Sequence, residues 1–465
     1  MTAREPRYLH MQEKAVAPRA ESNPLLTSPI LPTLARLSLP NMVAMVAGAS
    51  VAIAETIYVG FLGTASLAGM AMVFPMVMLQ QMMSAGAIGG GISSAISRAL
   101  GSGDEARARA LAAHAAVIGL VAGLGFTALY LLLGPAIYRA LGGRGEALAE
   151  ALAYSNVVFA GALAIWFTNT FASIIRAGGN MRLPSVTLLV GSTAQVVLGG
   201  GLGLGLASMP RLGMTGIALG QLASFVGATL FLLWFLTSGR ARVPLSFRGV
   251  TLRWSLFSDI LKVGALACLS SFQTVLTILI LTRLVAEFGT EALAGYGIGT
   301  RLEFLLIPIT FAIGVACVPM VGMAVGAGNL ARARRIAWTA GTMAAGIMGT
   351  IGLAGALAPG VWASLFTSDP AVLHSAATYL RWCGPAYAFF GLGLCLYFCS
   401  QGAGKVLGPV LAGTLRLAVV AAGGWYLASI DAEPWTMFAL VAIAMVIYGV
   451  ATALAVRAAA WGRPA

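Results

Sequence analysis

Two acidic side chains differ from the other acidic residues of this chain in their surroundings. Glu55 and Glu303 each lie inside a long apolar run, whereas the other acidic residues fall in polar segments or at the ends of apolar runs. A charged side chain within a lipid bilayer costs about 2.5 kcal/mol or more, so acids retained there usually face a cavity and perform a function. Both residues are therefore candidates for ion binding.

Glu55 is the stronger candidate for a coupling-ion site. It follows Pro40 within the same apolar run, and no basic residue lies within one helical turn of it. A solitary carboxyl group in such surroundings is suited to taking up and releasing a proton. The alternative interpretation is a Glu near the outer membrane interface whose side chain reaches water.

Glu303 has basic residues close by in the sequence. Arg301 precedes it, Pro308 follows it, and Arg381 and Arg416 lie in or near apolar runs of the same half of the chain. We predict that Glu303 forms a structural ion pair, with Arg301 as one candidate partner. A role of Arg301 and Glu303 in gating, or as a second coupling site, is the alternative.

Uncharged polar side chains within the apolar runs are candidate cavity or ion-site neighbours. An amide there either lines a cavity or forms an interhelical hydrogen bond, which contributes only about 0.6 kcal/mol on average. The candidates are Asn169, Gln195, Gln221 and Gln273.

The chain contains no recognisable motif for a metal, a nucleotide or catalysis. Its five cysteines fall in apolar runs and show no ligand spacing with a histidine, so we interpret them as reduced packing residues. The glycine-rich segment 199–205 lies within an apolar run rather than in a βαβ unit, and no Walker A motif or nucleophile elbow is present. We therefore expect that the protein is not an enzyme, that it binds no metal, and that it needs no cofactor other than a coupling ion.

The composition identifies the elements that must position these residues. The chain is 59% hydrophobic and only 9% charged, and apolar runs follow one another almost continuously from Leu37 to Val456. About 20 apolar residues span a bilayer as a helix, and the continuous runs do not alternate as membrane β-strands do. We predict an all-α integral membrane protein with about twelve transmembrane helices.

An internal repeat divides these helices into two halves. Residues 62–69 (LGTASLAG) match 288–295 (FGTEALAG), and residues 99–109 (ALGSGDEARAR) match 324–334 (AVGAGNLARAR) at nearly the same offset. An even number of spans in each half gives both halves the same orientation, with a pseudo-two-fold axis along the membrane normal. We therefore predict two pseudo-symmetric six-helix bundles, with the ligand between them.

The distribution of charge predicts the topology. The net charge is +13, and nearly all the basic residues fall in the tails and in alternate loops. By the positive-inside rule both termini face the cytoplasm, so the charge reports topology in an inner or plasma membrane rather than nucleic-acid binding. The predicted divisions are a cytoplasmic tail at 1–35, lobes at 36–237 and 258–456, a cytoplasmic linker at 238–257 and a tail at 457–465. The linker is either partly an interfacial helix or a plain loop.

The chain resembles the multidrug and toxic compound extrusion (MATE) family of efflux transporters over nearly its whole length. The resemblance rests on the segments 54–69, 98–108, 176–184 and 288–308. It implies a V-shaped pair of six-helix bundles that export cationic, amphipathic compounds in exchange for protons or sodium ions. Glu55 stands where members usually have Asp, and Pro40 stands where their first helix bends.

The resemblance also implies where a cation would bind. In the DinF-like branch, an Asn and an Asp in helix five and a Thr in helix six complete the amino-terminal site, and this chain has Gln195, Gly199 and Gln221 there. The second acid is missing, which favours protons over sodium ions. The NorM-like branch uses acids in helices seven and ten, where this chain has Gln273 and Gly391.

The predicted function is therefore cation-coupled antiport of cationic or amphipathic drugs and toxic compounds by a monomer in the bilayer, with protons favoured over sodium ions as the coupling ion. We expect substrate to enter a cavity between the lobes, and protonation of Glu55 to bend the first helix near Pro40 and displace it. The alternative is a flippase for lipid-linked oligosaccharides or other lipids. A membrane-embedded enzyme or receptor fits the sequence less well, because no catalytic dyad or ligand-binding ectodomain is visible.

Overall fold

The computed structural model describes residues 24–430 and 432–461, and all regular structure within them is helical. Within these residues eleven helices are long and apolar enough to cross a membrane, one of them the helix Thr64–Gly101, which includes a π-helical segment. Two shorter helices, α6 (Gly145–Ala160) and α7 (Ala162–Ala177), meet at Gly161 with a bend of 46° and are together long and apolar enough for a twelfth span. The predicted fold class is confirmed.

The first lobe holds the amino-terminal half of the spans. Besides α6 and α7, its helices are α1 (Pro24–Thr27), α2 (Ile30–Leu62), α3 (Thr64–Gln81), the π-helix η1 (Met82–Ile88), α4 (Gly89–Gly101), α5 (Glu105–Ala140), α8 (Arg182–Leu204) and α9 (Gly213–Thr237). The helix α2 is continuous through Pro40.

The second lobe repeats this arrangement. Its helices are α10 (Trp254–Ala286), α11 (Thr290–Gly326), α12 (Leu330–Leu357), the short α13 (Pro359–Ala363), α14 (Pro370–Gly402), α15 (Leu407–Ser429) and α16 (Pro434–Ala458). Residues 238–253 of the predicted linker contain no helix, and its last residues, 254–257, belong to α10, which begins at Trp254.

The sequence repeat is also a repeat of local structure. Asp104 caps α5 by accepting a hydrogen bond from the backbone N–H of Arg107 at 2.8 Å. Asn329 caps α12 by accepting one from the N–H of Arg332 at 3.0 Å. Such caps satisfy one of the free N–H groups of a helix start. Equivalent residues therefore begin the equivalent helices of the two lobes.

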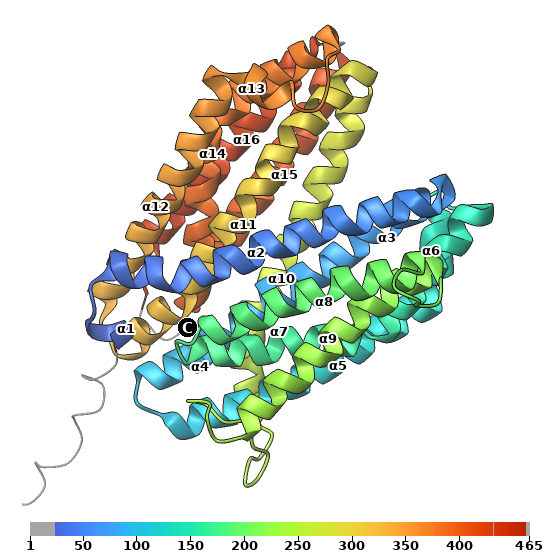
Figure 1. The fold of residues 1–465 in the computed structure, drawn as a ribbon. Coiled ribbons are helices and arrows are strands. Elements are labelled where there is room, and N and C mark those ends of the chain that lie inside the picture. Colours follow the sequence, from blue (N-terminus) through green and yellow to red (C-terminus); the bar gives the residue numbers. More distant parts are fainter. Residues whose placement is uncertain (1–23, 431, 462–465) are drawn as a thin grey trace, which may run out of the picture.

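The two bundles form a V (Figure 1). They meet at the end that carries α1, α4 and the last turns of α16, here called the closed end, and diverge toward the tips that carry α6 and α13, here called the open end. Contacts between the lobes run mainly from α11 to α4 and α2, and from α10 to η1 and α4. Helix α2 thus packs against both lobes.

Two glycines allow the close approach of α4 and α11 at the closed end. A Cβ atom on Gly101 would lie 2.2 Å from the carbonyl oxygen of Met323, and one on Gly326 would lie 2.0 Å from that of Arg98. Small residues of this kind let membrane helices pack with their backbones in contact.

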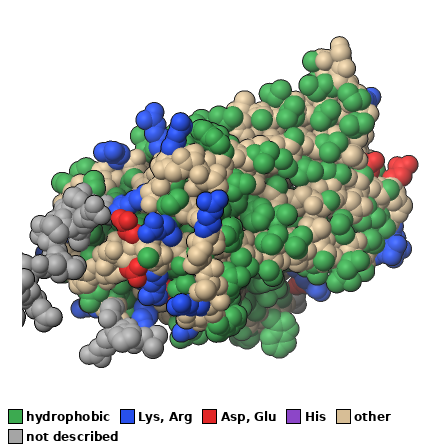
Figure 2. Space-filling model, turned by 90° about the horizontal axis from the view of Figure 1, so that it is seen from below, with side chains coloured by type: hydrophobic (Ala, Val, Ile, Leu, Met, Phe, Trp, Pro, Cys, Tyr) green, Lys and Arg blue, Asp and Glu red, His purple; other side chains and the backbone are tan. Residues whose placement is uncertain are grey.

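The outer surface fits a lipid environment. Large apolar side chains such as Leu132 and Val121 are exposed along the spans. In Figure 2 hydrophobic side chains are spread over the visible face, and most of the Lys and Arg side chains gather toward the closed end. An apolar surface of this extent is stable only in a bilayer.

Candidate functional site

Glu55 lies on the buried face of α2, in the half nearer the open end. Buried residues recur on that helix at Val51, Glu55 and Val59, which is the spacing of one helical face. The Glu55 side chain is 6% exposed. Gln195 on α8 donates a hydrogen bond from Nε2 to Glu55 Oε1 at 2.8 Å. The structure therefore brings together two of the residues selected from the sequence.

Tyr154 on α6 joins this cluster to a third selected residue. Its hydroxyl donates to Gln221 Oε1 on α9 at 2.7 Å, and both side chains are buried. Tyr154 is also close enough to Glu55 to interact with it electrostatically. The sequence analysis did not select Tyr154, because an aromatic residue in an apolar run usually indicates packing.

Asn169 on α7 belongs to a second polar cluster. Its Nδ2 donates to Gln81 Oε1 at 3.1 Å and to Ser84 Oγ at 2.8 Å. Ser84 lies in η1, and π-helical turns of this kind occur often at functional sites.

A cavity of about 370 Å³ connects the two clusters. Its wall includes one face of α8, where the lining residues recur at helical spacing from Pro184 to Gln195, and parallel faces of α7 and α9. Asn169 and Gln195 both line it. Met45, Phe225 and Phe311 form an apolar part of the wall, and Phe311 comes from the second lobe. The cavity therefore lies between the lobes, on the side of the first.

Arg176 is the single charged residue among the described residues that line this cavity. It lies in the last turn of α7 and is 6% exposed, and the sequence analysis did not select it. Its side chain has no hydrogen-bond or ion-pair partner among the described residues, and its Nε atom is fully buried. A cation in the last helical turn gains about 0.3–1 kcal/mol from the helix dipole. Burial of an unpaired ion costs several kcal/mol, so the dipole alone does not balance it.

Glu303 lies in the second lobe, away from Glu55. It accepts a hydrogen bond from the hydroxyl of Tyr379 and interacts electrostatically with Arg416. Arg301 is exposed and lies over the ring of Phe366, with its Cζ atom 4.9 Å from the ring centroid. No nitrogen of Arg301 comes within 4.0 Å of a described carboxylate. The structure thus does not bring Arg301 and Glu303 together, because the two side chains leave α11 in different directions.

Gln273 also lies apart from the Glu55 cluster. Its Nε2 donates to Thr414 Oγ1 at 2.7 Å, between α10 and α15 of the second lobe. This contact is an interhelical hydrogen bond of the kind that polar residues in membrane helices commonly form.

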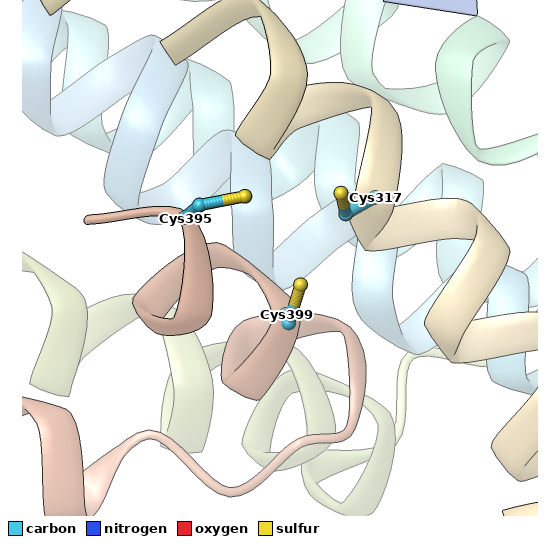
Figure 3. Close-up of side chains that lie close together, drawn as sticks. All are labelled: Cys317, Cys395 and Cys399. Carbon is cyan, nitrogen blue, oxygen red and sulfur yellow. The ribbon is translucent and has the colours of Figure 1, made fainter. Parts of the chain in front are cut away.

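Three of the cysteines gather in the core near the closed end. The sulfur atoms of Cys317 on α11 and of Cys395 and Cys399 on α14 lie within 4.8 Å of one another (Figure 3). All three side chains are fully buried among apolar residues, and each thiol interacts electrostatically with the other two. Spacing along the sequence did not reveal the cluster, because the two helices that form it are far apart in the chain.

Charged contacts join the lobes at the closed end. Asp259 at the start of α10 accepts a hydrogen bond from Arg98 on α4 at 2.8 Å and another from Arg107 on α5 at 2.9 Å. Arg98 also donates to Ser94 Oγ. The first helix of the second lobe is therefore held by two arginines of the first lobe.

A corresponding contact runs in the opposite direction. Arg332, the equivalent of Arg107, donates to the carbonyl oxygen of Leu25 at 3.1 Å and to that of Ser28 at 2.6 Å. These carbonyls precede α2, the first long helix of the first lobe. Each lobe thus uses the arginine of its repeat to hold the beginning of the other.

The chain belongs to the MATE family. The MatE family model matches it twice, at residues 40–199 and 267–427, once in each lobe. It is similar to a probable multidrug resistance protein NorM of Thermotoga maritima, with 25% identity over 81% of this chain and 81% of that one. It is also similar to a FAD transporter of Shewanella oneidensis, with 24% identity over 79% of this chain and 81% of that one.

Solved structures share the fold. A multidrug resistance MATE family transporter of the MOP superfamily, in an outward-facing conformation, superposes with a TM-score of 0.87 at 25% identity, over 93% of this chain and 96% of that chain. The protein is therefore a multi-span membrane transporter rather than an enzyme. The family resemblance expected from the sequence is confirmed.

Proposed function

We propose that this protein is a proton-coupled antiporter that exports amphipathic organic compounds from the cytoplasm. The observation that carries the proposal is the hydrogen bond between Glu55 and Gln195, because it connects a buried carboxyl group to a side chain of the cavity wall. None of the described residues that line the cavity is acidic. Of the substrates expected from the sequence, amphipathic compounds therefore fit this cavity better than cations do.

The polar contacts of Glu55 favour a proton over a sodium ion. Hard metal cations require several oxygen ligands. Gln195 presents its N–H group to Glu55, and the side-chain oxygen of Gln221 already accepts from Tyr154. Gly199 offers no side-chain ligand where the DinF-like branch has a second acid. A proton needs only the carboxyl group itself.

Protonation of Glu55 has two direct consequences in this geometry. A hydrogen bond to an ionised acceptor is roughly twice as strong as one between neutral groups, so protonation weakens the hold on Gln195. Helix α2 also contacts the second lobe, where Asn41 Nδ2 donates to the Ala312 carbonyl at 3.4 Å. Pro40, next to Asn41, lacks an N–H group, so α2 bends there more easily. We infer that protonation moves α2 and changes both the cavity and the contact between the lobes.

We infer that the closed end faces the cytoplasm. Lys and Arg gather at this end (Figure 2), as the positive-inside rule requires for a cytoplasmic face. Both ends of the described chain lie there, so the termini would be cytoplasmic and the V would open to the outside. Similarity to an outward-facing MATE transporter supports the same orientation. A monomer in the inner or plasma membrane is sufficient for this mechanism.

Efflux from proteoliposomes tests the proposal. Ethidium and 8-anilino-1-naphthalenesulfonate serve as cationic and anionic amphipathic dyes, under separately imposed proton and sodium gradients. We expect at least one dye to be exported with the proton gradient, and Glu55→Gln to abolish that dependence. Glu291→Gln, which neutralises an exposed acid at the start of α11, is the matched control and should transport normally.

Proton-driven efflux that persists in Glu55→Gln would refute the assignment of Glu55. Efflux that follows only the sodium gradient would identify sodium, and not the proton, as the coupling ion. Absence of efflux of either dye under both gradients would favour the flippase alternative.

A further inference from the structure

We propose that Arg176 makes the cavity between the lobes a binding site for an acidic group, so that the exported compounds are amphipathic organic anions. Carboxylates, sulfonates and phosphates are the groups concerned. This inference rests on the proposed export function and specifies its substrate class.

The surroundings of Arg176 leave its charge without a partner in the part of the chain that the structure describes. The side chain is 6% exposed, and no described residue accepts a hydrogen bond from it or forms an ion pair with it. The residues that share the cavity with it are neutral. Buried charges in proteins are normally paired, so an unpaired guanidinium that lines a cavity indicates that the partner is a ligand.

The second lobe supplies an internal comparison. Arg176 is the penultimate residue of α7, and the penultimate residue of the equivalent helix α14 is Gln401. Gln401 is fully buried and neutral, and its Nε2 donates to the Gly86 carbonyl at 3.2 Å. The repeat therefore places an uncharged, partnered side chain in one lobe and a charged, unpartnered one in the other. Packing of this helix end does not by itself require a cation.

The form of the cavity fits an amphipathic anion. A guanidinium group presents two parallel N–H donors, which match a carboxylate, sulfonate or phosphate. Beyond Arg176 the wall continues with Met82, Phe225 and Phe311, which offer apolar and aromatic contact. An acidic group bound at Arg176 therefore places its aromatic or aliphatic body against this wall. The volume of about 370 Å³ accommodates a molecule of drug size.

The position of Arg176 is compatible with coupling through Glu55. Arg176 precedes the start of α8 at the closed end, whereas Gln195, the partner of Glu55, lies 13 residues along α8. At the rise of an α-helix this corresponds to about 20 Å along the axis. Proton and anion therefore need not compete directly, and α2 and α8 transmit the coupling.

Binding of three probes of equal size tests the proposal without a gradient. The probes are a naphthalene ring with a butyrate, a butyramide or a butylamine side chain, titrated calorimetrically into full-length protein in phosphatidylcholine nanodiscs. We expect wild type to bind the butyrate at least ten-fold more tightly than the amide, and the amine most weakly. Arg176→Gln should remove this preference, and Arg176→Lys should keep part of it. Arg182→Gln, a loss of the same charge at an exposed position nearby, should leave the preference unchanged.

The proposal is overturned if the wild-type protein binds the butyrate no better than the amide. It is also overturned if the wild-type protein binds neither probe. This comparison does not require the Arg176→Gln variant to fold. A preference that survives in a folded Arg176→Gln variant also overturns it. Loss of butyrate binding when phosphatidylglycerol is added would assign the site to a lipid head group instead of a soluble anion. Because no proton gradient is used, failure of proton coupling in the efflux assay leaves this test unaffected.

Discussion

Gly101 and Gly326 contact the opposite helices in a reciprocal way. Each glycine faces the carbonyl oxygen of the residue three positions before the other, so Gly101 meets Met323 and Gly326 meets Arg98. The two pairs are related by the same repeat that relates the lobes. A pseudo-two-fold axis therefore passes between α4 and α11 at the closed end, where the two backbones touch.

Replacement of Gly326 by Ala should loosen this contact. The added Cβ would lie 2.0 Å from the Arg98 carbonyl oxygen, so the helices must separate. Overpacking of this kind costs about 1–3 kcal/mol. We expect a lower Tm for Gly326→Ala in a thermal-unfolding assay. Gly346→Ala on α12 is the control, because nothing lies within 4 Å of its added Cβ. Equal Tm values for the two variants would contradict the packing argument.

The ion pairs of Asp259 should hold the start of α10 in place at the closed end without adding much to the overall stability of the protein. Exposed and half-exposed ion pairs contribute only about 0–1 kcal/mol, so Asp259→Asn should change Tm little. Loss of the contacts with Arg98 and Arg107 should nevertheless free the start of α10. We expect faster amide hydrogen exchange over the first turns of α10 in Asp259→Asn than in Glu287→Gln, an exposed acid at the other end of the same helix. Identical exchange in both variants would show that the ion pairs do not hold this helix.

Gln195 should matter for coupling more than for folding. Gln195→Ala removes the one hydrogen bond that the described structure gives to Glu55 and leaves the carboxyl group in place. We expect folded protein whose efflux responds less steeply to an imposed pH gradient, by several-fold. Thr193→Ala, which removes an exposed hydroxyl two residues away on α8, should keep the normal response. A normal response in Gln195→Ala would exclude Gln195 from the coupling site.

Tyr379 and Glu303 should contribute to stability of the second lobe rather than to proton coupling. Tyr379→Phe leaves the Glu303 carboxyl group without its hydroxyl donor, and a buried group that loses such a partner costs about 1–3 kcal/mol. We expect a lower Tm with an unchanged dependence of efflux on the proton gradient. If Glu303→Gln instead abolishes proton-driven efflux, the second lobe holds a coupling site of its own.

The three clustered cysteines should act as packing residues. Each is fully buried among apolar side chains, and free Cys packs as a small hydrophobic residue. Purified protein should contain far less than one zinc or copper ion per chain by elemental analysis. Replacement of Cys317, Cys395 and Cys399 by Ala together should lower Tm and preserve proton-driven efflux. Stoichiometric metal that disappears in the triple variant would show instead that the thiols form a metal site.

The fold class and the duplication were determined by the sequence itself. Bilayer thickness fixes the length of an apolar run that spans it, so the spans are visible as runs between Leu37 and Val456. The repeat is visible because the turn before α5 and the turn before α12 use residues of the same types at the same positions. Glu55 could also be selected, because a carboxyl group in such a run is costly wherever its partners lie.

Only the tertiary structure decided which side chains meet. Gln195 lies 140 residues from Glu55 in the chain, and its contact depends on how α8 packs against α2. Helix packing likewise brings Tyr154 near Glu55 and directs Arg301 away from Glu303. It also places Arg176 in the wall of a cavity. The periodicity of a helix gives the face on which a side chain lies, but not the helix that covers that face. In a bilayer, apolar faces pack equally well against lipid and against other helices, so hydrophobicity alone cannot make that selection.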